Sequence, residues 1–258
     1  MIEAVIFDWA GTTVDYGCFA PVQAFMEAFA HFGIEVTMDE TRKPMGMLKI
    51  DHIRTMLHME RISRLWEEKY GRSASEEDVR AIYEQFEPKL LSILDQYSSP
   101  KPYVLDAVDE LRRMGLKIGS TTGYTNKMME IVVSEAAKQG YSPDCWFSPD
   151  STDGKGRPYP YMMFRNMQQL QISSVRNIVK VGDTVSDIKE GINSGAWSVG
   201  VIEGSSELGL TKKEWEALSD AEKKAEAKRV EASFRSAGAH CIIKNMSELP
   251  ALIRMLGV

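Results

Sequence analysis

Short apolar runs alternate with amphipathic stretches over most of this chain. Apolar runs with the length of buried strands cover residues 4–7, 117–121, 145–147, 178–181, 198–202 and 240–243. Segments with helical periodicity lie between or after them, at 103–114, 126–139, 160–170, 186–194 and 247–256. Strands that alternate with helices in this way predict a parallel sheet with helices on both faces. The fold class that we expect is therefore a doubly wound α/β core.

One long segment interrupts this alternation. From about residue 17 to residue 98 only helical patterning is found, and a Ser-Ser-Pro breaker follows it. Aromatic side chains recur there at helical spacing, at Phe25, Phe29 and Phe32. Thr37 and Glu40 have the spacing of a capping box. We therefore expect an all-helical cap domain, 17–98, inserted into a core domain formed by 1–16 and 99–258.

Composition and charge narrow the classes of partner. The chain has 258 residues, of which 43% are hydrophobic and 26% are charged, as is ordinary for a globular protein. A net charge of −6 argues against nucleic acid or an anionic membrane surface as the main partner. The stretch 211–235, rich in Lys, Glu and Ala, could be a helix that binds nucleic acid or a partner protein, but a solvated helical face is the interpretation that we adopt.

The first residues of the chain and the pattern of cysteines indicate the cellular compartment that we expect. The first residues lack a basic region and a long apolar region, so we expect no signal peptide. No apolar stretch approaches the roughly 18 residues of a membrane helix. Cys18, Cys145 and Cys241 are odd in number and far apart, which fits neither a disulfide framework nor a zinc site. We therefore expect a cytoplasmic protein without a membrane span.

Four motifs carry groups that could bind phosphate or a cation. They are Asp8-Trp9-Ala10-Gly11-Thr12-Thr13, Ile118-Gly119-Ser120-Thr121-Thr122-Gly123-Tyr124, Gly156-Arg157-Pro158-Tyr159-Pro160 and Val181-Gly182-Asp183-Thr184-Val185-Ser186-Asp187. Three of them lie at the carboxyl ends of predicted strands. Open α/β sheets bind their ligands at the carboxyl ends of the strands, where backbone N–H groups and helix N-termini can face an anion.

Each motif has a plainer interpretation when it stands alone. Asp8 followed by Gly-Thr could be an ordinary turn, hydroxyls before a helix are common N-caps, and Arg157 could be a surface residue. Asp183 and Asp187 form the most specific pair, because two carboxylates across a strand-to-helix turn can converge on Mg²⁺. Asp187 could instead only favour the positive end of the next helix.

In this order, the four motifs resemble the signature set of the haloacid dehalogenase superfamily. The resemblance covers essentially the whole chain, and the helical segment matches that superfamily's cap position. It implies that Asp8 is the nucleophile that becomes an aspartyl-phosphate. It further implies that Thr122 and Gly123 bind phosphate, and that Arg157 takes the position usually held by a lysine.

The same resemblance implies a Mg²⁺ site. Its protein ligands are expected to be Asp8, Asp183 and the backbone carbonyl of Ala10. Asp187 is expected either as a further ligand or as a carboxylate behind the ligands.

Two departures from the common pattern narrow the expected reaction. Most phosphatases and phosphomutases of the superfamily have a second aspartate where this chain has Ala10, and that aspartate protonates the leaving oxygen. A carbon leaving group that departs as an enamine needs no such proton, provided that a lysine forms an imine with the substrate. Lys49 is the candidate, and His52 would share its helical face and could shuttle protons. The plainer interpretation is a solvated lysine and a packed histidine.

The segments Asp-Trp-Ala-Gly-Thr, Pro-Met-Gly-Met-Leu-Lys-Ile-Asp-His and Gly-Ser-Thr-Thr-Gly-Tyr are similar to those of the phosphonoacetaldehyde hydrolase family. The resemblance implies a small-molecule phosphonate as substrate, an imine on Lys49, and acetaldehyde and phosphate as products. It places Cys18, Met45 and Tyr124 near the site, although Cys18 and Met45 could equally be core packing. It also suggests a homodimer through the cap helices.

Two alternatives remain open at this point. A capped phosphatase or phosphomutase acting on a phosphate ester is disfavoured by Ala10. A protein of this fold that binds a phosphorylated ligand without turnover is disfavoured by the intact set of Asp8, Thr122, Arg157 and Asp183.

Overall fold

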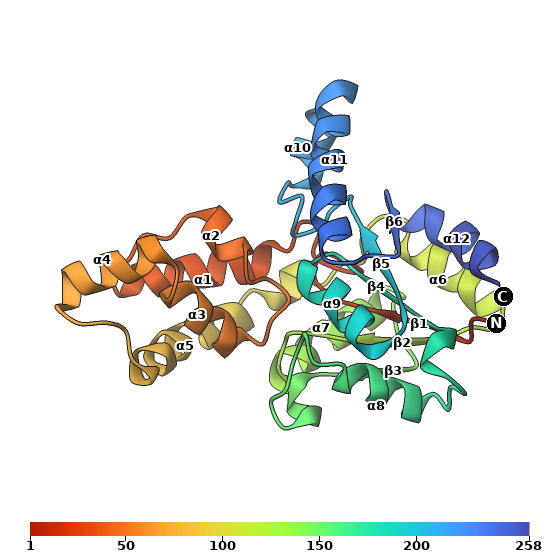
Figure 1. Ribbon diagram of the computed structural model, residues 1–258, viewed down its shortest axis with the longest axis horizontal. Coiled ribbons are helices and arrows are strands. Elements are labelled where there is room, and N and C mark those ends of the chain that lie inside the picture. Colours follow the sequence, from red (N-terminus) through yellow and green to blue (C-terminus); the bar gives the residue numbers. More distant parts are fainter. Residues whose placement is uncertain (258) are drawn as a thin grey trace.

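The computed structural model describes residues 1–257 and has a six-stranded parallel sheet at its centre (Figure 1). The strand order is β3-β2-β1-β4-β5-β6, and every neighbouring pair is parallel. The strands are β1 Ala4–Phe7, β2 Lys117–Thr121, β3 Cys145–Phe147, β4 Ile178–Gly182, β5 Trp197–Val201 and β6 Cys241–Ile243. All the carboxyl ends therefore meet at one edge of the sheet, and the predicted doubly wound α/β core is confirmed.

Helices cover both faces of the sheet because each buried strand sends alternate side chains to opposite sides. In β1, Val5 and Phe7 join one apolar cluster, whereas Ala4 and Ile6 join another. The first cluster contains side chains of α6 Val104–Arg113, α7 Asn126–Lys138 and α12 Leu249–Leu256. The second contains side chains of α8 Tyr161–Gln169, and α9 Val185–Ser194 packs against β4 and β5 near it.

Differences from the predicted boundaries are small and lie at element ends. The strand predicted at 198–202 starts one residue earlier, because Trp197 already pairs with Val179 of β4. The predicted last helix starts at Leu249 and is preceded by a 3₁₀ turn. The 3₁₀ helices are η1 Leu94–Tyr97, η2 Pro149–Thr152, η3 Val175–Asn177 and η4 Met246–Glu248.

A separate helical lobe follows β1 and contains no strand among its described residues (Figure 1). Its helices are α1 Phe19–His31, α2 Met38–Arg42, α3 Lys49–Leu57, α4 Glu60–Tyr70 and α5 Glu76–Leu91. The capping box of Thr37 and Glu40 starts α2 as predicted. Phe25 of α1 stacks on Phe86 of α5 with ring centroids 4.1 Å apart, inside the core of the lobe. The two chain segments that enter and leave the lobe lie side by side, joined by a bridge between Val14 and Pro100.

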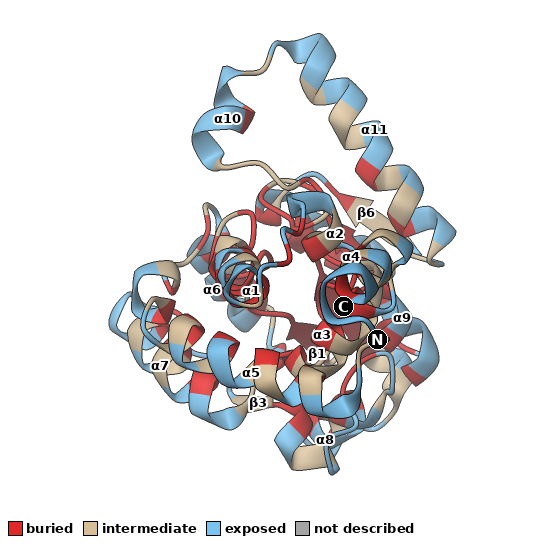
Figure 2. Ribbon diagram, turned by 90° about the vertical axis from the view of Figure 1, so that its left-hand side faces the viewer, coloured by how far each residue is buried: buried red, intermediate tan, exposed pale blue. Residues whose placement is uncertain are grey.

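An arm of two helices stands out from the core between β5 and β6 (Figure 2). The helices are α10 Lys212–Ala217 and α11 Asp220–Ser236, and each starts with its own capping box, at Thr211 and Ser219. Most of α11 is exposed, and Val230 and Phe234 are its buried residues. The lysine- and glutamate-rich stretch is thus largely a solvated helical surface. Among the described residues, no helix has both the length and the apolarity that crossing a membrane requires.

Candidate active site

A small cavity lies between the cap and the carboxyl edge of the sheet. Its lining combines both lobes: Asp8, Ala10, Cys18, Met45, Gly46, Lys49, Thr122, Gly123, Tyr124, Arg157 and Thr184. Nine of these side chains and backbone groups were candidates from the sequence, and Gly46 and Thr184 were not. The cavity therefore brings the predicted nucleophile and the predicted imine-forming lysine to one small space.

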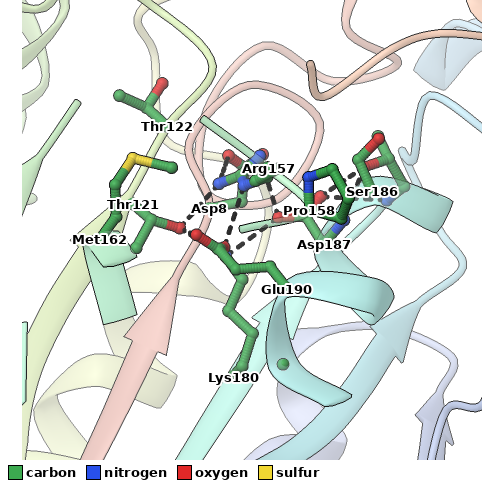
Figure 3. Close-up of polar contacts among 12 residues, drawn as sticks. Asp8, Thr121, Thr122, Arg157, Pro158, Met162, Lys180, Ser186, Asp187 and Glu190 are labelled. Atoms are coloured by element: carbon green, nitrogen blue, oxygen red, sulfur yellow. Dashed lines mark hydrogen bonds and ion pairs between the residues drawn. The ribbon is translucent and has the colours of Figure 1, made fainter. Parts of the chain in front are cut away.

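Asp8 follows β1 directly and forms a buried ion pair with Arg157 (Figure 3). Arg157 Nη2 lies 2.6 Å from Asp8 Oδ1, and Nη1 lies 3.0 Å from Asp187 Oδ1. Nε of the same guanidinium donates to Glu190 Oε2 at 3.0 Å. Burial raises the pKa of the Asp8 carboxyl, while Arg157 opposes that rise by stabilising the carboxylate. Arg157 thus has the position and charge to face a phosphoryl group on Asp8.

Three residues that the sequence analysis did not single out complete this network. Lys180 Nζ lies 3.0 Å from Asp187 Oδ1 and 3.3 Å from Glu190 Oε2, and it donates to Thr121 Oγ1 at 2.9 Å. Thr121 Oγ1 also donates to Glu190 Oε2 at 2.8 Å. The sequence does contain features that point to two of them: Lys180 is a charged residue inside an apolar strand, and Glu190 follows Asp187 by one helical turn.

The carboxylates of Asp8, Asp183 and Asp187 converge, and one oxygen of each lies within 4.8 Å of the others. Two donors orient Asp183: Thr12 Oγ1 at 2.7 Å and the backbone N–H of Ser206 at 2.8 Å. Burial, together with the charges of Asp8 and Asp187, raises the pKa of Asp183 well above its usual range. Three buried carboxylates so close together fit an oxygen-seeking divalent cation such as Mg²⁺, because a cation would offset their repulsion.

The absence of a side chain at Gly11 leaves space for the Asp183 carboxylate. The φ of Gly11 is +88°, and a Cβ at this position would overlap the Asp183 carboxylate. Asp187 also caps the N-terminus of α9, in addition to its place in the carboxylate cluster. Its Oδ2 accepts from Thr184 Oγ1 at 2.6 Å in a capping box that starts α9. The two sequence interpretations of Asp187, a carboxylate at the ion site and a helix-capping residue, are therefore compatible.

Lys49 is the first residue of α3 and is buried against aromatic rings. Its Nζ lies 4.9 Å from the ring centroid of Tyr124 and 5.8 Å from that of Phe25. Burial lowers the pKa of the Lys49 amine, since the charged form loses hydration. A larger fraction of the amine is therefore neutral, which is the form that attacks an aldehyde.

His52 lies one helical turn after Lys49 but does not line the cavity. Its ring stacks on Phe25 with centroids 3.9 Å apart, and its Nε2 hydrogen-bonds to the carbonyl oxygen of Thr41 at 2.8 Å. Burial holds the pKa of His52 well below its usual range, so the imidazole is neutral. The structure therefore places His52 behind Lys49, in the cap interior, and away from the position that a direct proton shuttle needs.

The remaining candidates form the walls of the cavity. Thr122 Oγ1 accepts from the backbone N–H of Tyr124 at 3.0 Å, and Figure 3 shows Thr122 apart from the charged network that Thr121 joins. Cys18 and Met45 belong to one small apolar cluster and also line the cavity, so core packing and a place beside the predicted site are compatible. Burial raises the pKa of the Cys18 thiol well above its usual range and keeps it protonated.

Several known proteins are similar to this chain over most of its length. Residues 2–195 match the haloacid dehalogenase-like hydrolase family. The chain is 51% identical to a phosphonoacetaldehyde hydrolase of Lysinibacillus sphaericus (strain C3-41), over 99% of this chain and 95% of that protein. It is 54% identical to a bifunctional phosphonoacetaldehyde hydrolase/aminoethylphosphonate transaminase of Clostridioides difficile (strain 630), where the match covers 98% of this chain and 40% of that longer protein.

A solved structure matches over nearly the full length as well. It is a phosphonoacetaldehyde hydrolase-like protein from Oleispira antarctica, 39% identical, with a TM-score of 0.95. The match covers 99% of this chain and 92% of that chain.

Proposed function

Because the chain belongs to the haloacid dehalogenase-like hydrolases, and within them to the phosphonoacetaldehyde hydrolases, we propose that it hydrolyses the carbon–phosphorus bond of phosphonoacetaldehyde. The products are acetaldehyde and phosphate. One observation carries the proposal: Asp8 and a buried Lys49 line the same small cavity, whereas the residue two positions after Asp8 is Ala10. The cavity therefore offers a nucleophile and an amine, and it lacks the aspartate that would protonate an oxygen leaving group.

The first step belongs to Lys49. Its neutral amine attacks the aldehyde carbon of the substrate, and loss of water leaves an imine that is protonated to an iminium. The iminium withdraws electrons from the neighbouring carbon–phosphorus bond. The departing carbon then needs no general acid, which explains why Ala10 is tolerated.

The second step belongs to Asp8. A carboxylate oxygen forms a bond to phosphorus, the carbon–phosphorus bond breaks, and its electron pair passes into a neutral enamine on Lys49. Arg157, 2.6 Å from Asp8, neutralises charge as the phosphoryl group arrives. Protonation of the enamine carbon and addition of water release acetaldehyde from Lys49. Water also hydrolyses the aspartyl-phosphate, which returns Asp8 and releases phosphate.

We assign a Mg²⁺ ion to the carboxylate cluster, with Asp8, Asp183 and the backbone carbonyl of Ala10 as ligands. Asp187, whose Oδ1 already pairs with Arg157 and Lys180, is either a further ligand or a carboxylate behind the ligands. The convergence of the three carboxylates within 4.8 Å supports this assignment. When bound, Mg²⁺ supplies positive charge that offsets the repulsion between Asp8 and a phosphoryl dianion. Thr12 and the N–H of Ser206 orient Asp183 before any ligand arrives.

The cavity walls bind and orient the substrate. We assign phosphoryl contacts to Thr122, Gly123 and Arg157, and contacts with the two-carbon part to Cys18, Met45 and Tyr124, because all six line the cavity. His52 acts indirectly in this proposal: it packs under Lys49 through Phe25 and so helps to hold the amine in place. The homodimer and the cytoplasmic location remain predictions from the family resemblance and the cysteine pattern.

The test is a product assay with phosphonoacetaldehyde as substrate. We expect acetaldehyde and phosphate in equal amounts, and little phosphate from sugar phosphates or other phosphate esters under the same conditions. Faster turnover of a phosphate ester would instead return the phosphatase or phosphomutase interpretation. No turnover of any phosphoryl compound would favour a binding protein.

A further inference from the structure

One loop of the core, residues 203–206, touches both chain segments that lead into and out of the cap. We call it the junction loop. The N–H of Gly17, in the first linker, donates to the carbonyl oxygen of Gly204 at 2.8 Å. Lys101, at the end of the second linker, donates from Nζ to the carbonyl oxygen of Glu203 at 2.8 Å. The position of both linkers is therefore tied to this loop.

The cap itself reaches the same loop through Arg42, the last residue of α2. Arg42 Nη1 donates to the carbonyl oxygen of Gly17 at 2.7 Å and lies 3.3 Å from both the carbonyl oxygen and Oγ of Ser206. Its guanidinium carbon lies 4.7 Å from the ring centroid of Phe19, in a cation–π contact. Arg42 thus joins a cap helix, a linker and the junction loop.

The residue that Arg42 contacts, Ser206, also holds an ion-site carboxylate. The backbone N–H of Ser206 donates to Asp183 Oδ2 at 2.8 Å. Two consecutive links, Arg42 to Ser206 and Ser206 to Asp183, therefore connect the cap with the orientation of Asp183.

A second connection links the cap to Asp187, the ion-site carboxylate that lies in α9. Ser186 Oγ donates to the carbonyl oxygen of Met45 at 3.0 Å, in the cap turn between α2 and α3. Ser186 lies between Thr184 and Asp187, whose side chains form the capping box of α9. The turn that delivers Lys49 to the cavity is thus bonded to the segment that carries Asp187.

From these contacts we propose that cap closure and divalent-ion binding are coupled through Arg42–Ser206 and Met45–Ser186. A closed cap holds Asp183 and Asp187 in place for Mg²⁺, and bound Mg²⁺ in turn stabilises the closed cap. The two effects are equal in size, because a coupling free energy between two events is reciprocal. Lys49 therefore reaches the cavity most fully when the ion that Asp8 requires is already bound. This inference rests on the Mg²⁺ site of the proposed function.

The test measures Mg²⁺ affinity by calorimetry on the enzyme without substrate. Arg42→Met removes one connection, and Ser186→Ala removes the other while it deletes only a hydroxyl. We expect each variant to bind Mg²⁺ about fivefold more weakly or worse. Arg64→Met is the matched control, because Arg64 is an exposed cap arginine that pairs with Glu68 within its own helix. It should bind Mg²⁺ as the wild type does.

Cap opening is measured separately through Cys18, which is buried in the cavity. We expect saturating Mg²⁺ to slow alkylation of Cys18, mapped by mass spectrometry, about fivefold or more in the wild type. This protection should shrink below about twofold in Arg42→Met and in Ser186→Ala. If Arg42→Met does not fold, Ser186→Ala alone decides.

The outcomes separate this inference from the proposed function. Mg²⁺ affinity and Cys18 protection that are the same in both variants as in the wild type would overturn the coupling and leave the ion site standing. A wild type that binds no Mg²⁺, or an Asp183→Ala variant that binds it equally well, would overturn the ion site and the coupling with it.

Discussion

Arg157 and Asp8 are 149 residues apart in the chain, yet the guanidinium and the carboxylate are paired at 2.6 Å in the core. The same guanidinium also pairs with Asp187 and Glu190. A single planar group therefore connects the proposed nucleophile with two acids of α9. A lysine has one ammonium and no such fork.

This geometry predicts the effect of Arg157→Lys. The variant keeps the positive charge but cannot maintain all three ion pairs, so we expect kcat/KM to fall by about 10- to 100-fold, as for the loss of one charge-assisted hydrogen bond. Steady-state kinetics with phosphonoacetaldehyde measure this. Arg165→Lys, at an exposed position of α8, is the control and should be silent. A loss smaller than twofold in Arg157→Lys would show that charge alone is sufficient.

Asp8→Asn should abolish phosphoryl transfer, because an amide oxygen is not an effective nucleophile toward phosphorus. We expect activity to fall by about 1,000-fold or more, since a lost nucleophile costs several kcal/mol of barrier. Circular dichroism should show an unchanged fold, as the amide is nearly the same shape as the carboxylate. Activity within about tenfold of the wild type would exclude Asp8 as the nucleophile.

Removal of divalent ions should also abolish activity. Arg157 and Lys180 offset only part of the repulsion among the carboxylates of Asp8, Asp183 and Asp187 and toward an incoming phosphoryl group, so we expect a divalent cation to be needed as well. We expect dialysis against a chelator to inactivate the enzyme and Mg²⁺ to restore it. Asp183→Ala should weaken Mg²⁺ binding by about tenfold or more, measured by calorimetry. Full activity after exhaustive chelation would contradict this prediction.

Lys49→Arg separates a covalent role of the lysine from an electrostatic one. Arginine keeps the charge but forms no imine, so we expect a loss of about 1,000-fold or more, comparable to that of Asp8→Asn. Borohydride added with phosphonoacetaldehyde should inactivate the wild type and leave a reduced adduct on Lys49, mapped by mass spectrometry. Lys43, an exposed lysine of the same cap segment, is the internal control. An adduct on Lys43 would keep the imine mechanism but move it to another residue.

Adduct formation should depend on pH in a direction that the burial of Lys49 determines. Burial lowers the pKa of the amine, so the neutral form that attacks the aldehyde is available at lower pH than for a solvated lysine. We expect the rate of reductive trapping on Lys49 to rise with pH and to reach its plateau with a midpoint below about 10.4, the usual lysine value. A midpoint at or above that value would show that the amine is not desolvated when it reacts.

Much of this protein could be predicted from local patterns. Buried parallel strands are short apolar runs, and β1, β2 and β3 lie where those runs predict them. The carboxyl ends of parallel strands share one edge, so Asp8 and Asp183 were expected to converge, and they do. Together with the family resemblance, the alanine at position 10 and the lysine in the helical segment indicated the class of reaction.

Tertiary packing alone determined which side chains face which partners. The sequence singled out Thr122, but the hydroxyl that bonds to Lys180, Glu190 and Arg157 belongs to Thr121, the last residue of β2. Thr122 lies beyond the strand, where side chains no longer alternate between the two faces of the sheet. His52 shares the helix of Lys49, yet packing on Phe25 turns it into the cap interior. The N–H of Ser206 on Asp183 leaves no side-chain signal in the sequence, since any residue except proline has a backbone donor. Long-range contacts of this kind depend on how the cap and core meet, and that is a property of the folded chain as a whole.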